Sequence, residues 1–121
     1  MSYISEVTIA IPKTLVTIFE ELEGLNLGGG PVWDHKVENQ SDTHTYYEIN
    51  DCVFDPSTGD TGAIVEFCEH QNRLAKLLNT GNTPLIEAAI MRVGEGNDDI
   101  EDYFRNGFAC GLETVTEIMY V

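Results

Sequence analysis

The strongest constraint on the fold is the alternation of apolar and polar side chains near the start of the chain, from Tyr3 to Ile11. A period of two residues is typical of a β-strand that buries one of its faces. The segment therefore predicts a half-buried strand. Its two faces would carry Val7, Ile9 and Ile11 on the buried side, and Glu6 and Thr8 on the other.

A helix is predicted directly after this strand. Pro12 stands where the first turn of a helix accepts proline, and Gly24 is a typical C-terminal stop. Between them the apolar residues recur at helical spacing, at Leu15, Ile18, Phe19 and Leu22, and Leu25 continues the pattern.

The middle of the chain contains two further strand patterns. Residues 32–38 and 44–54 both favour strands, and residues 39–42 between them have the composition of a hairpin turn. A second turn is predicted over residues 55–62. Residues 63–68 fit either the return strand of another hairpin or the start of a helix that runs to Leu78, and periodicity does not decide between the two.

The last third of the chain mixes helix and strand patterns. Residues 69–78 favour a helix, and residues 85–93 favour a buried strand or a short helix. Residues 97–107 predict a further helix, because Asn97 is a good N-cap and acidic residues fill the first turn after it. Residues 114–121 predict a terminal strand.

This order of elements predicts a single acidic α+β domain over residues 1–121. We expect an antiparallel or mixed sheet of four to six strands, with two or three helices packed on one face. A ferredoxin-like arrangement is the first guess.

The unusual property of the composition is its charge. The chain has 21 acidic residues against six Lys and Arg, which gives a net charge of −15. A field of this sign repels phosphate backbones and anionic membrane surfaces, and it speeds encounter with basic partners. We therefore expect a basic protein partner and no direct binding of nucleic acid or membrane.

The compartment is predicted from what the sequence lacks. The first residues do not resemble a secretory signal, and no apolar run approaches the roughly 18 residues of a membrane helix. Three widely spaced cysteines, Cys52, Cys68 and Cys110, include no Cys-x-x-Cys pair. These features favour a cytoplasmic protein without a disulfide framework or a zinc site.

Two segments resemble ligand-binding loops only superficially. Gly28, Gly29 and Gly30 follow a helix and precede a strand, which is the reverse of a phosphate-binding loop. Residues 55–66 begin and end with an acid, as a calcium loop does, but Asp60 stands where that loop requires glycine. We expect no cofactor and no metal.

Histidine and cysteine offer a weak alternative. His35, His44 and His70 could meet a cysteine in the fold, and Cys68 and His70 would share one face if their segment were a strand. A small enzyme or ligand-binding protein with a site near His44, His70 and Cys68 is therefore the second hypothesis, although no pair shows a recognised ligand spacing.

Two acidic clusters are the candidates for partner binding. Glu20, Glu21 and Glu23 fall in the predicted last turn of the first helix, where the helix dipole disfavours negative charge and no nearby base offsets it. Between residues 95 and 102 five of eight residues are acids, which helix capping largely explains. The predicted partner-binding residues are Glu20, Glu21, Glu23, Asp98, Asp99, Glu101 and Asp102.

The first hypothesis for function follows from charge. It is a small acidic inhibitor or immunity-type protein that mimics DNA and occludes the basic, nucleic-acid-binding surface of a partner, and it could be phage-encoded. A third hypothesis is a structural or accessory subunit of a homo-oligomer, with Trp33, Tyr46 and Tyr47 as candidates for its interface.

Overall fold

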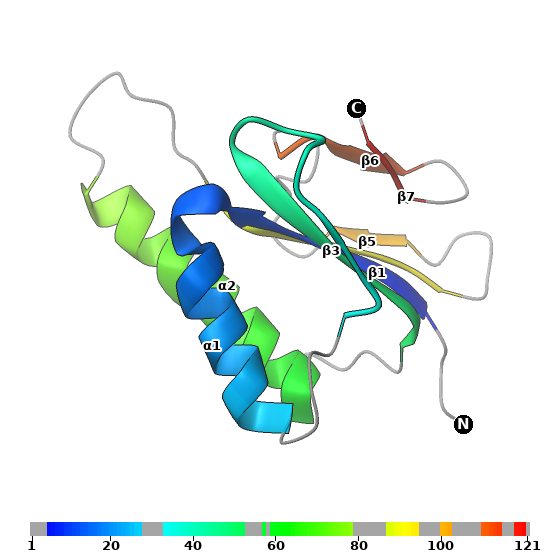
Figure 1. Ribbon diagram of the computed structural model, residues 1–121, viewed down its shortest axis with the longest axis horizontal. Coiled ribbons are helices and arrows are strands. Elements are labelled where there is room, and N and C mark those ends of the chain that lie inside the picture. Colours follow the sequence, from blue (N-terminus) through cyan, green and yellow to red (C-terminus); the bar gives the residue numbers. More distant parts are fainter. Residues whose placement is uncertain are drawn as a thin grey trace.

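The structure is a computed structural model that describes residues 5–27, 33–52, 57, 59–78, 87–94, 100–102, 110–114 and 118–120. Two helices lie on one side of a sheet, and a small hairpin lies on the other side (Figure 1). The strands are β1 (Ser5–Pro12), β2 (His35–Val37), β3 (His44–Cys52), β4 (Ala89–Val93), β5 (Ile100–Asp102), β6 (Leu112–Thr114) and β7 (Ile118–Tyr120). The helices are the 3-10 turn η1 (Lys13–Leu15), α1 (Val16–Leu27) and α2 (Gly59–Leu78).

The main sheet has five antiparallel strands in the order β2-β3-β1-β4-β5. Up to β4, strands and α-helices follow one another as β-α-β-β-α-β, which is the ferredoxin-like or split βαβ order. The predicted α+β class, with both helices on one face, is therefore confirmed, and the connectivity agrees with the first guess.

Strand β1 occupies the centre of the sheet and is buried on both faces. Val7, Ile9 and Ile11 pack against the helices, as the alternation predicts. Thr8 and Ala10 are buried as well, and Ala10 contributes to a second core on the hairpin side. The prediction of a half-buried strand was therefore wrong. The β6–β7 hairpin covers the second face of β1, which the alternation alone predicts to be exposed.

The helix layer is built around aromatic side chains. The ring of Phe19 on α1 packs against Trp33, Tyr47 and Phe67, at centroid distances of 6.1, 4.8 and 5.5 Å. Trp33 also packs against Tyr47, at 4.6 Å. Tyr46 and Tyr47 are buried, and Trp33 is half-buried, so these residues serve packing within the described part of the chain.

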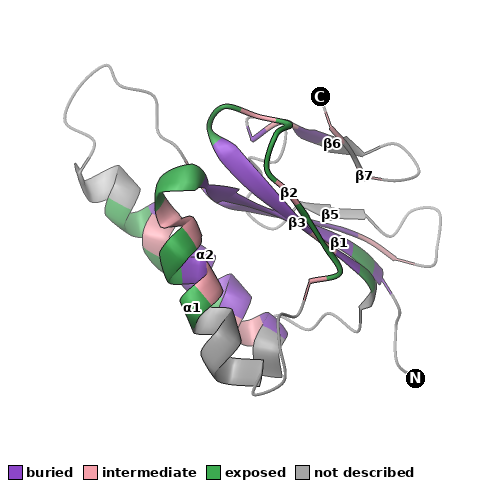
Figure 2. Ribbon diagram, in the orientation of Figure 1, coloured by how far each residue is buried: buried purple, intermediate pink, exposed green. Residues whose placement is uncertain are grey.

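Helix α2 resolves the ambiguity over residues 63–68. These residues lie inside one continuous helix that carries buried positions along its length (Figure 2). Ile64, Val65 and Cys68 belong to the core on the helix side of the sheet. The predicted turn over residues 55–62 is wrong at its end, because α2 begins at Gly59. The buried side chains of this segment are spaced as on one face of a helix, whereas a strand would have directed them alternately to its two faces.

Three side chains from separate elements form hydrogen bonds with the backbone of Glu87 and Ala88, just before β4. We call this group of hydrogen bonds the β4 seam. The amide of Asn72 on α2 donates to the Ala88 carbonyl at 3.1 Å and accepts from the Ala88 N–H at 2.9 Å. The Glu87 carbonyl accepts from His44 Nε2 at 2.7 Å and from the Cys110 thiol at 3.1 Å. The seam therefore joins α2, β3 and the turn before β6.

The hairpin of β6 and β7 forms the second layer on the sheet. The Tyr46 hydroxyl donates to the Cys110 carbonyl at 2.5 Å, and the Tyr120 hydroxyl donates to the Glu48 carboxylate. Gly111 has φ +88, and a Cβ there would lie 2.5 Å from Tyr46 Oη. A single terminal strand over residues 114–121 was predicted, which is wrong, because two short strands pair across the intervening residues.

The predicted helix over residues 97–107 is wrong where the structure describes it. Ile100–Asp102 forms β5 and pairs with β4 in the register Val93 to Ile100 and Met91 to Asp102. The capping pattern at Asn97 favours a helix locally, but backbone pairing with β4 overrides a preference worth a few tenths of a kcal/mol per residue.

Candidate functional site

The first acidic cluster lies in the middle of α1 and not at its end. Helix α1 continues to Leu27, beyond the predicted stop at Gly24. Glu20, Glu21 and Glu23 are therefore at least one turn away from the negative end of the helix dipole, whose influence is confined to the last turn. The helix dipole therefore does not disfavour these three carboxylates, although that effect was the reason for selecting them as candidates.

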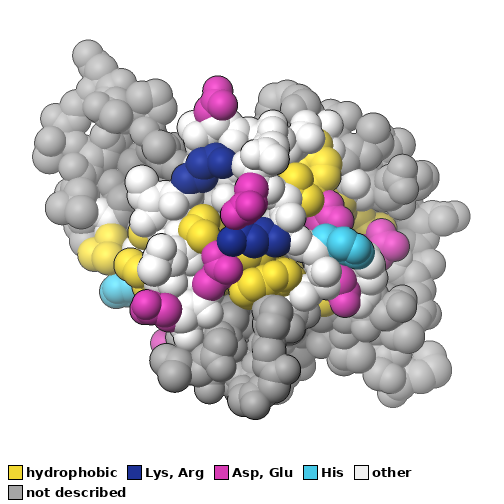
Figure 3. All heavy atoms as spheres, viewed as in Figure 1, with side chains coloured by type: hydrophobic (Ala, Val, Ile, Leu, Met, Phe, Trp, Pro, Cys, Tyr) yellow, Lys and Arg dark blue, Asp and Glu magenta, His cyan; other side chains and the backbone are white. Residues whose placement is uncertain are grey.

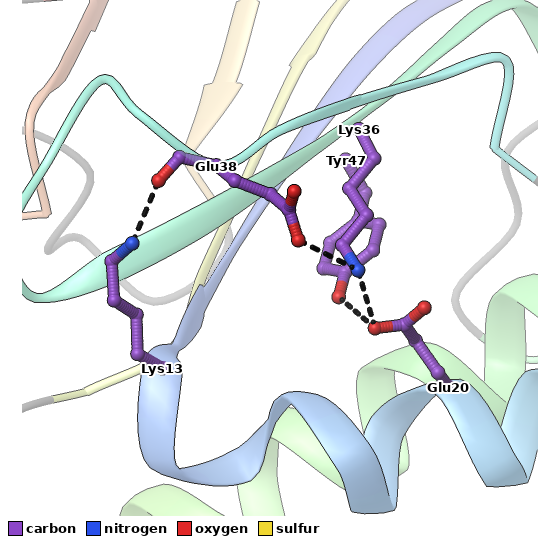
Figure 4. Close-up of polar contacts among 5 residues, drawn as sticks. All are labelled: Lys13, Glu20, Lys36, Glu38 and Tyr47. Atoms are coloured by element: carbon purple, nitrogen blue, oxygen red, sulfur yellow. Dashed lines mark hydrogen bonds and ion pairs between the residues drawn. The ribbon is translucent and has the colours of Figure 1, made fainter.

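Glu20 also has a basic neighbour, contrary to the prediction that no base offsets this cluster. Lys36 Nζ on β2 lies 2.9 Å from Glu20 Oε2 and 3.1 Å from Glu38 Oε1 (Figure 4). The Tyr47 hydroxyl donates to the same Glu20 oxygen at 3.2 Å. The hydrogen bond to Glu20 raises the pKa of Lys36, which keeps its charge. We call this group the Lys36 cluster.

The Lys36 cluster joins α1 to the edge of the sheet. Lys13 extends it, because its ammonium donates to the Glu38 carbonyl at 2.7 Å. Burial, followed by the charge of Glu20, raises the pKa of Tyr47, so its hydroxyl remains a donor. The Lys36 and Glu20 side chains are partly exposed, and surface pairs of this kind contribute about 0.2 to 1 kcal/mol. Glu20 is thus a bridging residue, whereas Glu21 is exposed.

The described residues of the second acidic cluster lie on β5, the edge strand opposite β2. Glu101 and Asp102 belong to β5, whereas Asp98 and Asp99 lie outside the described residues. Four interstrand steps of about 4.8 Å separate β5 from β2, or about 19 Å. Acids on an edge strand also discourage pairing with another chain. The structure therefore does not bring the described residues of the two predicted clusters together.

The histidines and cysteines of the second hypothesis do not converge. His44 is buried at the β4 seam, on the hairpin side of β3, whereas Cys68 is buried in the core on the helix side. His70 is exposed on α2, two residues from Cys68, and two helical steps turn side chains to nearly opposite sides. No metal-binding group of three His, Cys, Asp or Glu side chains occurs among the described residues.

His44 is held as a neutral imidazole by its surroundings. Burial lowers its pKa, and the carbonyl of Glu87 opposes this effect. Because Nε2 donates to that carbonyl, Nδ1 accepts from the Thr43 hydroxyl at 2.8 Å. Both ring nitrogens are engaged, and neither is directed at an open site that could serve catalysis.

Two of the four described basic residues contribute little positive charge to the surface. Arg92 is only 7% exposed and donates to Ser5 Oγ at 2.7 Å, and Lys36 lies between two carboxylates. On the face shown in Figure 3, Lys and Arg side chains lie next to Asp and Glu side chains. Arg73 is exposed on α2. The described surface is acidic because exposed acids, such as Glu21 and Glu66, outnumber the exposed bases.

A groove on the outer side of α2 was not anticipated from the sequence. It encloses about 310 Å³ and is lined by Ala63, Glu66, Phe67 and His70. These residues are spaced by three, one and three positions, so they share one helical face. That spacing would have indicated the groove if residues 63–78 had been interpreted as one helix.

Searches of protein-family models, curated proteins and solved structures found no match to this chain. None of the helices, over the residues that the structure describes, combines the length and apolar character needed to cross a membrane.

Proposed function

We propose that the protein is a small acidic binding protein that covers a basic surface of a protein partner, and that this surface otherwise binds nucleic acid. The observation that carries the proposal is the disposition of charge. The chain has a net charge of −15, and among its described bases Arg92 is buried and Lys36 is paired with two carboxylates. Carboxylates at a surface can occupy the lysines and arginines that would hold phosphates.

The acidic residues that would meet the partner are exposed on more than one element. Of the predicted residues, Glu21 is exposed and Glu20 is already bridged to Lys36. Glu66 and Glu69 on α2 add exposed acids to the helix layer. The outer surface of the helices is therefore the stronger candidate within the described chain, and Glu101 and Asp102 form a separate candidate at the β5 edge.

Affinity capture from the native host tests the proposal. The immobilised protein is exposed to cell extract, bound proteins are eluted with increasing salt, and each recovered partner is purified and measured alone. We expect a basic partner whose affinity falls steeply with salt and whose binding to nucleic acid is lost when this protein is added. A partner that retains nucleic acid in the complex, or self-assembly insensitive to salt, would contradict the proposal.

A further inference from the structure

The α2 groove, formed by Ala63, Glu66, Phe67 and His70, has an apolar floor at Phe67. Phe67 is 9% exposed, and its ring packs against Phe19 in the aromatic core at 5.5 Å. Ala63 is half-buried one turn before Phe67 and leaves the space of about 310 Å³ above the helix surface. The groove is thus supported by the core of the domain.

Exposed apolar side chains extend this surface beyond the groove. Leu74 lies four residues after His70 on the same face of α2 and is 38% exposed. Ile18, near the start of α1, is 51% exposed. The two helices run antiparallel, and the start of α1 lies beside the second half of α2 (Figure 1). The outer helix layer therefore presents large apolar side chains to solvent.

Acidic residues border this apolar surface. Glu66 lines the groove, Glu69 is exposed one turn before Arg73, and Glu21 is exposed on α1. Among the side chains that the structure describes on the two helices, these three exposed carboxylates outnumber the one exposed guanidinium, in a chain whose net charge is −15. The complementary ligand is an apolar side chain flanked by lysine or arginine, because interfaces combine a buried apolar anchor with a charged rim.

We propose that the α2 groove binds one large apolar side chain within a basic segment of the partner, while Glu66 and Glu69 pair with the flanking cations. This inference rests on the proposed function and names the part of the partner that α2 recognises. The cations would govern the rate of encounter, and the apolar side chain would slow dissociation.

Two peptides test the anchor directly. The probes are acetyl-Lys-Lys-Phe-Lys-Lys-amide and the same peptide with glycine at its centre, titrated into the ¹⁵N-labelled full chain. We expect the phenylalanine peptide to bind about tenfold more tightly and to shift the backbone amides of Ala63, Phe67 and His70. Equal binding of the two peptides, or shifts confined to the Lys36 cluster, would overturn the groove assignment.

A variant that fills the groove provides the second test. Ala63→Leu places a larger side chain in the hollow at a partly exposed helical position, and Gln40→Leu adds the same side chain at an exposed turn as the control. We expect Ala63→Leu to remove the advantage of phenylalanine over glycine and Gln40→Leu to preserve it. If both variants preserve it, the anchor does not enter this groove.

The same experiments separate this inference from the proposed function. If the natural partner binds Ala63→Leu with unchanged affinity and unchanged salt dependence, the groove assignment is wrong while the acidic binding function stands. If neither the partner nor the lysine peptides lose affinity as salt rises, the proposed function itself fails.

Discussion

The inner and outer sides of α2 use polar side chains for different purposes. On the inner side, Asn72 is 8% exposed and forms two hydrogen bonds with the backbone of Ala88 in the β4 seam. On the outer side, Glu66 and His70 are exposed beside an apolar groove. The difference indicates that the inner contacts maintain the fold, and that the outer side chains are available to a partner.

The largest effect is expected where the inner side of α2 joins the sheet. Asn72→Ala removes both hydrogen bonds to the buried backbone of Ala88 and should lower the free energy of unfolding by about 2 to 4 kcal/mol. Urea unfolding measures this change, and Gln71→Ala, one residue away, is the control. A loss for Asn72→Ala no larger than that of the control would mean that the seam contributes little.

The next effect concerns the turn that connects the seam to the hairpin. Gly111→Ala adds a Cβ at positive φ, 2.5 Å from Tyr46 Oη, and should destabilise the protein by about 2 to 3 kcal/mol.

Tyr46→Phe tests the cause of that loss. Without the hydroxyl, the ring carbon Cζ of residue 46 lies 3.7 Å from the added Cβ, which is an ordinary van der Waals distance. The cost of Gly111→Ala should then fall to about 1 to 2 kcal/mol, the cost of backbone strain alone. An unchanged cost would show that the hydroxyl is not the obstacle.

His44 makes the inner region sensitive to pH. Burial lowers its folded pKa below the ordinary 6.5, so the unfolded chain binds the proton first as the pH falls. The free energy of unfolding should therefore decrease below pH 6.5, by at most about 1.4 kcal/mol per pH unit for this one proton.

His44→Gln isolates this contribution between about pH 5.5 and 7.5, above the ordinary range of the carboxylates. The variant should be less stable at neutral pH and should lose the part of the pH dependence that belongs to His44. If wild type and variant show the same pH dependence, His44 titrates alike in the folded and unfolded chains.

The smallest effect on stability is expected at the outer surface. Glu20→Gln removes the 2.9 Å ion pair while Glu38 still holds Lys36, and should cost less than about 1 kcal/mol. The same substitution should bring the pKa of Lys36 closer to its ordinary value, which NMR titration of the lysine side chain measures. A larger loss of stability would place the Lys36 cluster among the contacts that maintain the fold.

The sequence predicted the elements whose local pattern agrees with their tertiary environment. β1 was predicted from the alternation of Val7, Ile9 and Ile11, and α1 from the helical spacing around Phe19. The hairpin composition of residues 39–42 correctly predicted the turn between β2 and β3. Each of these patterns is repeated over several residues, so that no single contact is needed to specify the element.

The errors fall where a distant segment decides the outcome. Residues 100–102 carry the acids of a helical first turn, yet they pair with β4. Thr8 resembles an outward residue until the hairpin covers it. The base that offsets Glu20 was missed for a related reason, because Lys36 is sixteen residues away on a strand. Sequence spacing carries no information on such a contact.

The most direct test of the central claim is the rate at which this protein associates with the partner recovered by affinity capture, measured by stopped flow as the NaCl concentration rises. If charge drives recognition, the association rate constant should fall steeply with salt while the dissociation rate constant changes little. An association rate that does not depend on salt would contradict the claim.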